Sequence, residues 1–256
     1  MSMTRSSFYQ RLITIIALGV FVYSLYHLVP SLYDYYKNDK TLKGVQQIYE
    51  TTLDVKGDDE NGEIVRSSFL LLQEINTDIV GWITADQTKI HYPILQAEDN
   101  EFYLTRNYQK EETRAGSIFL DYRNDTNLEN NWNTIIYGHR MKDGSMFGQL
   151  KKYLEKDFFN ENSTIYLDSL YEGYDVEVFS VYQTTTDFYY IETEFSDGPD
   201  YQQFIQQLQE RSLYEADVEI GPDDQIVTLS TCDYAVDSLE GRLVVHGKLV
   251  KRGEAG

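Results

Sequence analysis

The sequence predicts a mainly β fold, a closed or nearly closed barrel of eight strands interrupted by short helices. Eight segments are rich in β-branched and aromatic residues, and residues 173–185 alternate in period two as a strand does. Several of these strands are short, and closure into a barrel removes the unpaired edges they would otherwise expose. The strands are expected at Ile79–Thr84, Lys89–Leu95, Gly116–Leu120, Asn133–Gly138, Thr164–Asp168, Gly173–Thr185, Gln225–Thr231 and Arg242–Lys251.

The N-terminal region predicts one transmembrane helix. Residues 12–30 carry no charged side chain, and at the helical rise they reach ~29 Å, about the apolar thickness of a bilayer. Arg5 and Arg11 precede this run and Asp34 is the first charge after it, which predicts a cytoplasmic tail at residues 1–11. The long apolar run favours an uncleaved signal anchor over a removed signal peptide. We therefore expect a single-pass protein of the cell membrane whose folded domain is extracellular.

The region after the anchor predicts a stalk, a linker and then a folded domain. Apolar residues recur at helical spacing over residues 42–53, so the membrane helix is expected to continue or restart as an amphipathic stalk. Residues 54–62 are rich in glycine and acid and are interpreted as a linker, which gives a stalk and linker over 31–62 and an extracellular folded domain over 63–256. Helices of that domain are expected at Glu63–Asn76, Ser145–Leu154 and Pro199–Arg211.

The composition excludes several classes of function. The net charge of −20 repels phosphate backbones, so nucleic-acid binding is not expected. The sequence has no glycine-rich phosphate loop, no HExxH motif and no Cys/His cluster, so neither a metal nor another cofactor is expected. The acidic pairs Glu98-Asp99 and Asp223-Asp224 are interpreted as solvated loops rather than calcium sites.

Cys232 is the only cysteine and a candidate nucleophile. Alone, it cannot form an intramolecular disulfide, which leaves either a buried packing role or a reactive one. It follows an apolar run at 226–229 and precedes Asp233, so it is expected at the end of a strand, where scaffolds present reactive groups. This position favours the nucleophile.

His139 is the preferred candidate for the acid/base partner among four histidines. It follows Gly138 at a predicted strand end and precedes a polar stretch, which suits a group that must meet a substrate. His27 lies in the membrane segment and His91 within a strand, where a structural role is favoured. His246 is also within a strand, but alternation places it on the face of Arg242, so it stays an alternative.

Arg242 opens the last predicted strand, ten residues after Cys232. It is either a solvated surface arginine or a donor of hydrogen bonds to an oxyanion, the group that develops in acyl transfer.

The chain resembles the sortases, and closely their class B, over about residues 74–251. The final motif, after Tyr-Gly-His and before an arginine, is the most specific part. The resemblance is carried by Val80-Gly81-Trp82-Ile83, Tyr92-Pro93-Ile94-Leu95-Gln96, Gly116-Ser117-Ile118-Phe119, Tyr137-Gly138-His139, Met146-Phe147, Thr184-Thr185-Thr186 and Thr228-Leu229-Ser230-Thr231-Cys232.

The resemblance implies an eight-stranded sortase-type barrel with N-terminal helices, and a cysteine transpeptidase of a Gram-positive-type bacterium. By it, Cys232 attacks the threonine carbonyl of a C-terminal sorting motif in a secreted protein and forms a thioacyl-enzyme. His139 protonates the leaving amine and deprotonates the incoming one, and Arg242 holds the carbonyl or its oxyanion. The acceptor is an amine of the peptidoglycan cross-bridge or, in pilus assembly, a pilin lysine. Substrate contacts are implied at Asn100, Leu104, Thr186, Tyr190, Ile191 and Ser230.

Three other classes are weighed against this interpretation. Cell-wall L,D-transpeptidases also use Cys, His and Arg, but they place glycine and histidine around the cysteine, unlike Ser230-Thr231-Cys232-Asp233. Papain-like peptidases have the cysteine before the histidine in the chain, the reverse of the order here. An anchored, non-enzymatic scaffold gives no reason for the Cys-His-Arg set.

Overall fold

The structure, a computed structural model, describes residues 5–51, 56–58, 64–237 and 239–253. Residues 1–41 and 42–256 form two compact units. The helices are α1 (Arg5–Thr51), α2 (Ser67–Ile75), α3 (Lys156–Glu161) and α4 (Gly198–Arg211), with 3-10 helices η1 (Phe102–Leu104), η2 (Leu128–Asn130) and η3 (Phe147–Leu154). The strands are β1 (Lys56–Asp58), β2 (Ile64–Arg66), β3 (Ile79–Thr84), β4 (His91–Leu95), β5 (Ile118–Leu120), β6 (Asn133–Tyr137), β7 (Thr164–Ser169), β8 (Gly173–Thr184), β9 (Ile226–Cys232) and β10 (Arg242–Lys251).

Helix α1 contains an apolar stretch long enough to cross a membrane. Its most apolar window has a mean hydropathy of 2.1 and none of that window is buried. The helix continues through Pro30 without a break, so the apolar segment and the start of the predicted stalk belong to one helix. Length and composition of this kind fit a membrane anchor or a signal sequence.

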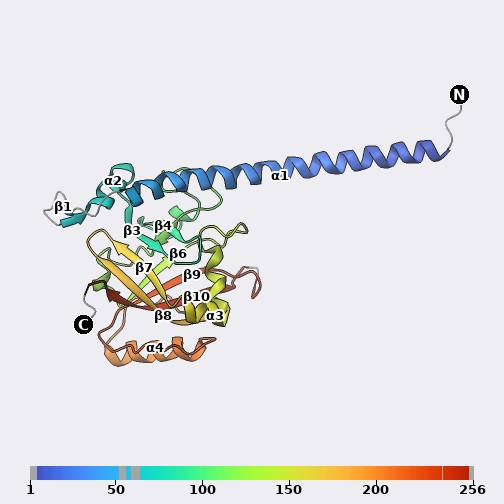
Figure 1. The fold of residues 1–256 in the computed structure, drawn as a ribbon. Coiled ribbons are helices and arrows are strands. Elements are labelled where there is room, and N and C mark those ends of the chain that lie inside the picture. The colour runs from blue at the N-terminus through green and yellow to red at the C-terminus, as the bar shows by residue number, and fades with distance from the viewer. Residues whose placement is uncertain (1–4, 52–55, 59–63, 238, 254–256) are drawn as a thin grey trace. The chain divides into compact units, whose positions relative to one another are not determined.

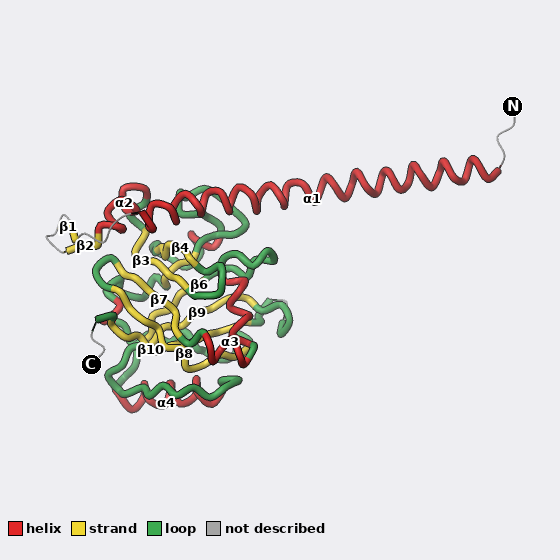
Figure 2. The backbone as a smooth tube through the Cα atoms, in the orientation of Figure 1, coloured by secondary structure: helices red, strands yellow, loops and turns green. Residues whose placement is uncertain are grey.

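Eight strands close into a barrel in the order β10-β8-β7-β3-β4-β5-β6-β9, which confirms the predicted fold class (Figure 1). The pairs β4–β5 and β6–β9 are parallel and the other six pairs are antiparallel. All eight predicted strands are present, with ends that differ from the prediction by no more than two residues. Figure 2 shows how loops cover both ends of the barrel strands.

Buried side chains pack on both faces of the barrel wall. Leu243 and Val245 belong to one buried cluster together with residues of η3, whereas Val244 belongs to a second cluster under α4. Helix α4, in orange in Figure 1, lies along β8 and covers this part of the wall. A strand covered on both faces is buried residue after residue, and β10 has that character from Leu243 to Gly247.

The region before the barrel corrects the predicted linker and first helix. Within the predicted linker 54–62, residues 56–58 are described and form β1, which pairs with β2; the others lie outside the described residues. The helix predicted to begin at Glu63 begins at Ser67, because Arg66 is still in β2 and its backbone N–H donates to the carbonyl oxygen of Leu170.

The predicted helix at 145–154 is also corrected. The chain forms the 3-10 helix η3 over 147–154, entered through Met146 at a φ of 53°. Helix α3 follows it and had no counterpart among the predicted helices.

Candidate active site

Cys232 and Arg242 face each other across an antiparallel strand pair. Cys232 is the last residue of β9, Arg242 is the first of β10, and the two are direct partners in the register. The thiol is half-buried and free of any disulfide. The strand-end position predicted for Cys232 is therefore present, and the turn after it returns the chain to the guanidinium.

His139 reaches the same edge of the sheet through a parallel pair. Strand β6 pairs with β9 so that Tyr137 lies opposite Ser230, and the Gly138 N–H donates to the Ser230 carbonyl oxygen at 3.2 Å. His139 lies two residues after Tyr137, and Cys232 lies two residues after Ser230. Because parallel strands end at the same edge, the register brings both side chains to one place.

Gly138, the residue before His139, packs closely against the barrel core because it has no side chain. A Cβ at this position would lie 2.3 Å from Cδ1 of Ile118 and 2.8 Å from Cδ2 of Phe147. Both neighbours are fully buried and belong to the barrel core. A close packing of this kind requires glycine at the residue that directs His139 out of the barrel.

The three candidate catalytic residues line one hollow of about 240 Å³. Of the predicted substrate contacts, three share this lining, and the other three, Thr186, Tyr190 and Ile191, lie on the loop between β8 and α4. The other four lining residues, Phe119, Tyr137, Gly138 and Thr231, were not among the predicted site residues. The lining is formed by Asn100, Leu104, Phe119, Tyr137, Gly138, His139, Ser230, Thr231, Cys232 and Arg242.

The His139 ring is fixed by a hydrogen bond to the opposite wall of the hollow. Its Nε2 lies 2.7 Å from the carbonyl oxygen of Leu104, at the end of η1. A carbonyl oxygen only accepts, so Nε2 carries a proton in this arrangement. In the neutral ring Nδ1 is then the nitrogen that can take up a proton.

The Arg242 guanidinium is held by its own turn and lies beside a buried tyrosine. Its Nη1 donates to the carbonyl oxygens of Leu239 at 3.2 Å and of Gly241 at 2.9 Å. Burial raises the pKa of Tyr190, and the nearby Ser230 hydroxyl and Arg242 charge only partly offset this effect. The phenol therefore stays neutral, with its hydroxyl 2.8 Å from Oγ of Ser230.

An ion pair joins the two residues that follow His139 and Cys232. Arg140 Nη1 donates to the buried carboxylate of Asp233, which also accepts from Gln183 and from the Ala235 N–H. Burial alone would raise the pKa of Asp233, but these donors outweigh it and lower the pKa below its usual value. Asp233 thus stays ionised and ties the β6 end to the turn after β9.

The other histidines are placed outside the hollow. His246 is fully buried, with Nε2 at 2.8 Å from the Tyr182 hydroxyl and Nδ1 at 2.8 Å from Oγ1 of Thr228. Burial lowers the pKa of His246 to about 3, so it is a neutral structural residue and the alternative base is not supported by its position. His91 begins β4 rather than lying within it, and its Nδ1 accepts from the Trp82 indole N–H at 3.1 Å.

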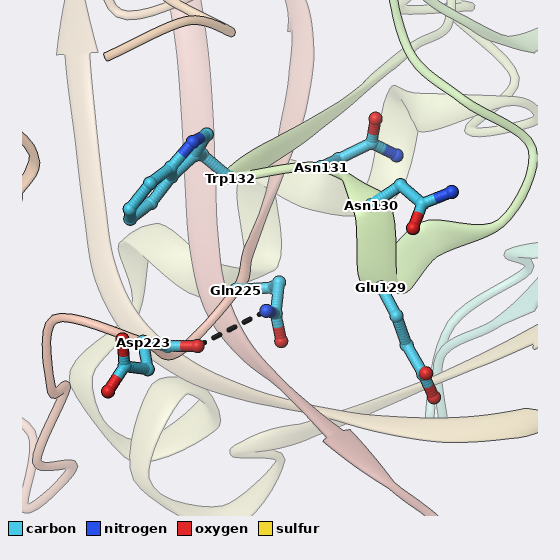
Figure 3. Close-up of a pocket in the computed structure, with 6 residues that line it drawn as sticks. All are labelled: Glu129, Asn130, Asn131, Trp132, Asp223 and Gln225. Atoms are coloured by element: carbon cyan, nitrogen blue, oxygen red, sulfur yellow. Dashed lines mark hydrogen bonds between the residues drawn. The ribbon is translucent and has the colours of Figure 1, made fainter. Parts of the chain in front are cut away.

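A second hollow, of about 360 Å³, lies at the other end of β6 and β9 (Figure 3). It is lined by Trp132, Gln225, Asp223 and the 129–131 segment, and Figure 3 shows the Gln225 amide turned toward the backbone of Asp223. It contains neither cysteine nor histidine, so its lining offers no nucleophile with a base. Among the described residues no three His, Cys, Asp or Glu side chains gather as metal ligands would.

Comparison with known proteins shows the family to which the chain belongs. The sortase domain model matches residues 83–250. Sortase B of Listeria monocytogenes is 47% identical over 246 residues, which cover 96% of this chain and 98% of that protein. Sortase B of Staphylococcus aureus is 43% identical over 190 residues, 74% of this chain and 77% of that protein.

Solved structures give the same result. A crystal structure of sortase B from Bacillus anthracis superposes with a TM-score of 0.77 at 56% identity and covers 86% of this chain and all of that one. A Staphylococcus aureus sortase B–substrate complex superposes with a TM-score of 0.76 at 38% identity, over 84% of this chain and 97% of that one. The chain therefore belongs to the sortase family, as a class B cysteine transpeptidase, the class that anchors proteins to the cell wall.

Proposed function

We propose that Cys232 is the nucleophile, His139 the acid/base and Arg242 the oxyanion donor of this transpeptidase. One observation carries the proposal: the β6–β9 and β9–β10 registers bring these three side chains to the lining of one hollow. A nucleophile, a proton carrier and a cation around one space are the groups that acyl transfer requires.

The reaction begins with attack of the Cys232 thiolate on the threonine carbonyl carbon of a sorting motif. The tetrahedral intermediate collapses with cleavage of the C–N bond, and the leaving amine takes a proton from the His139 imidazolium. The product of this half-reaction is a thioacyl-enzyme on Cys232. An incoming amine then attacks the thioester, gives its proton to His139 and releases the thiolate, so that the enzyme returns to its starting state.

Arg242 stabilises the negative charge that develops on the carbonyl oxygen. The two backbone carbonyls that accept from Nη1 keep the guanidinium at the first residue of β10, next to Cys232. A planar guanidinium offers several donors in a fixed fork, which a lysine ammonium does not.

The acyl donor is a secreted protein with a C-terminal sorting signal, and its motif binds along the hollow. Asn100, Leu104 and Ser230 contact it in the hollow, and Thr186, Tyr190 and Ile191 contact it from the β8–α4 loop. Support comes from the Staphylococcus aureus sortase B that was solved with its substrate, which shares this fold.

The acceptor is an amine of the peptidoglycan cross-bridge rather than a pilin lysine. A related sortase B was solved in complex with triglycine, a short peptide with a free amine, at 38% identity and a TM-score of 0.76.

The N-terminal helix holds the enzyme in the cell membrane in a single pass, with residues 1–11 in the cytoplasm and residues 63–256 outside, beyond the 31–62 stalk and linker.

The test is a transfer reaction in detergent with the full chain. Threonine-containing sorting peptides of varied sequence are incubated with a glycine oligomer or a lysine side-chain amine, and products are identified by mass spectrometry. We expect cleavage after threonine and a new amide to the glycine oligomer, with no product from Cys232→Ala. Transfer to the lysine amine alone would favour pilin polymerisation, and no cleavage of any threonine peptide would contradict the proposal.

A further inference from the structure

A buried carboxylate under the hollow connects two parts of the proposed substrate site. Asp121 follows β5 and its side chain is fully buried. Its Oδ2 accepts from the Tyr137 hydroxyl at 2.9 Å and from Nδ2 of Asn100 at 3.0 Å, and both of these residues line the hollow. Asp121 therefore fixes the orientation of two lining side chains from behind.

Arg123 pairs with this carboxylate and extends from it to the loop between β8 and α4. Its Nε and Nη2 donate to the two Asp121 oxygens at 2.9 and 2.8 Å. The same guanidinium donates through Nη1 to the Tyr189 hydroxyl and through Nη2 to the Ile191 carbonyl oxygen, both at 3.0 Å. These two loop residues flank Tyr190, whose hydroxyl bonds Ser230 in the hollow.

Asp121 stays ionised in the folded protein, so its ion pair with Arg123 is retained. Burial would raise the pKa of Asp121, but the hydrogen bonds from Arg123 and Tyr137 outweigh it and keep the pKa below its usual value. A buried carboxylate with five donors on its two oxygens is satisfied, so the pair is stable in the folded state. Loss of Arg123 would leave the charge of Asp121 without its counter-ion and the loop without two of its donors.

We propose that Arg123 is a positioning residue: it holds the 189–191 segment directly and Asn100 through Asp121, and so sets the affinity for the acyl-donor peptide. Arg123 touches none of the reacting groups: it is not part of the lining of the hollow, and its side chain donates to Asp121, Tyr189 and Ile191. Its effect is thus on binding, not on the chemical step. This inference rests on the function proposed above for the hollow.

The experiment compares Arg123→Gln and Arg123→Lys with Arg252→Gln in the full chain. Arg252 is a matched control, because it binds the carboxylate of Asp175 at 2.9 Å and the carbonyl oxygen of Tyr174 at 2.8 Å, at the opposite end of β8 and β10. Two readouts are taken: KM and kcat for peptide cleavage, and amide hydrogen exchange of residues 185–197.

We expect Arg123→Gln to raise KM ~10-fold with kcat within about twofold, since two hydrogen bonds from a charged donor are lost from the loop. Exchange in residues 185–197 should accelerate. Arg123→Lys keeps the charge but not the fork, and should give an intermediate KM. Arg252→Gln should leave KM, kcat and loop exchange as in the wild type.

An unchanged KM and unchanged loop exchange in Arg123→Gln would overturn the proposal, as would an equal effect of Arg252→Gln. If Arg123→Gln does not fold, Tyr189→Phe decides, because it deletes one bond at a residue that is 53% exposed; faster loop exchange supports the proposal and unchanged exchange overturns it. If wild type and variants all fail to cleave sorting peptides, the function proposed for the hollow has failed, and loop exchange still tests the positioning role.

Discussion

His246 makes the stability of the barrel depend on pH in a window where carboxylates contribute little. Its ring is fully buried between Tyr182 and Thr228, and burial lowers its pKa from 6.5 to about 3. Below pH 6.5 the His246 ring is protonated in the unfolded chain, whereas in the native state it stays neutral down to about pH 3. The free energy of unfolding therefore falls as the pH drops through 6.5. Between about pH 7.5 and about pH 5.5, this linkage removes ~1.4 kcal/mol of the free energy of unfolding.

The assay is urea unfolding of the wild type and of His246→Gln at both pH values. The variant is expected to be less stable by ~1–3 kcal/mol at the higher pH, because buried hydrogen bonds are weakened. Its loss of stability on acidification should be smaller than that of the wild type by ~1.4 kcal/mol. The lowered pKa of His91 acts in the same direction and is common to both proteins. An equal pH dependence of wild type and variant would refute the reasoning.

Three further predictions concern the site itself. His139→Ala should reduce peptide turnover by ~10²-fold or more while the circular dichroism spectrum is kept, and a loss of activity in folded His246→Gln instead would mean that the base is misassigned. Arg242→Lys should reduce turnover by ~10²–10³-fold although the charge remains, and wild-type kinetics in that variant would remove Arg242 from the reaction. Gly138→Ala should cost ~1–3 kcal/mol of stability in thermal unfolding, because the new methyl group overlaps Ile118 and Phe147; an unchanged midpoint would show that the core yields at this point.

The barrel could be predicted because its strands carry a local signal. Period-two alternation and β-branched runs located every strand of the barrel to within two residues. The β1–β2 pair was missed, since Gly57 and Asp58 are typical of loops and the three residues of β2 lead directly into α2. Apolar spacing also does not separate a 3-10 helix from an α-helix over eight residues, so the type of η3 was missed.

The site divides in the same way. The placement of Cys232, His139 and Arg242 at one hollow could be predicted because each stands where an apolar strand begins or ends. The Asp121–Arg123 pair could not, because Arg123 reaches partners 66 and 68 residues away through side-chain hydrogen bonds. A polar Asp-Tyr-Arg sequence directly after β5 was the available signal, and it is equally typical of a solvated turn.

The central claim, that Cys232 carries the acyl group, is tested most directly by trapping the intermediate. The full chain is mixed with an intact sorting peptide that it cleaves, in the absence of an amine acceptor, and the mixture is quenched in acid and mapped by mass spectrometry. We predict a mass increase equal to the acyl fragment ending in threonine, located on Cys232 and released by hydroxylamine as expected for a thioester. Cleavage at the wild-type rate by Cys232→Ala, or an acyl group found on another residue, would contradict the account.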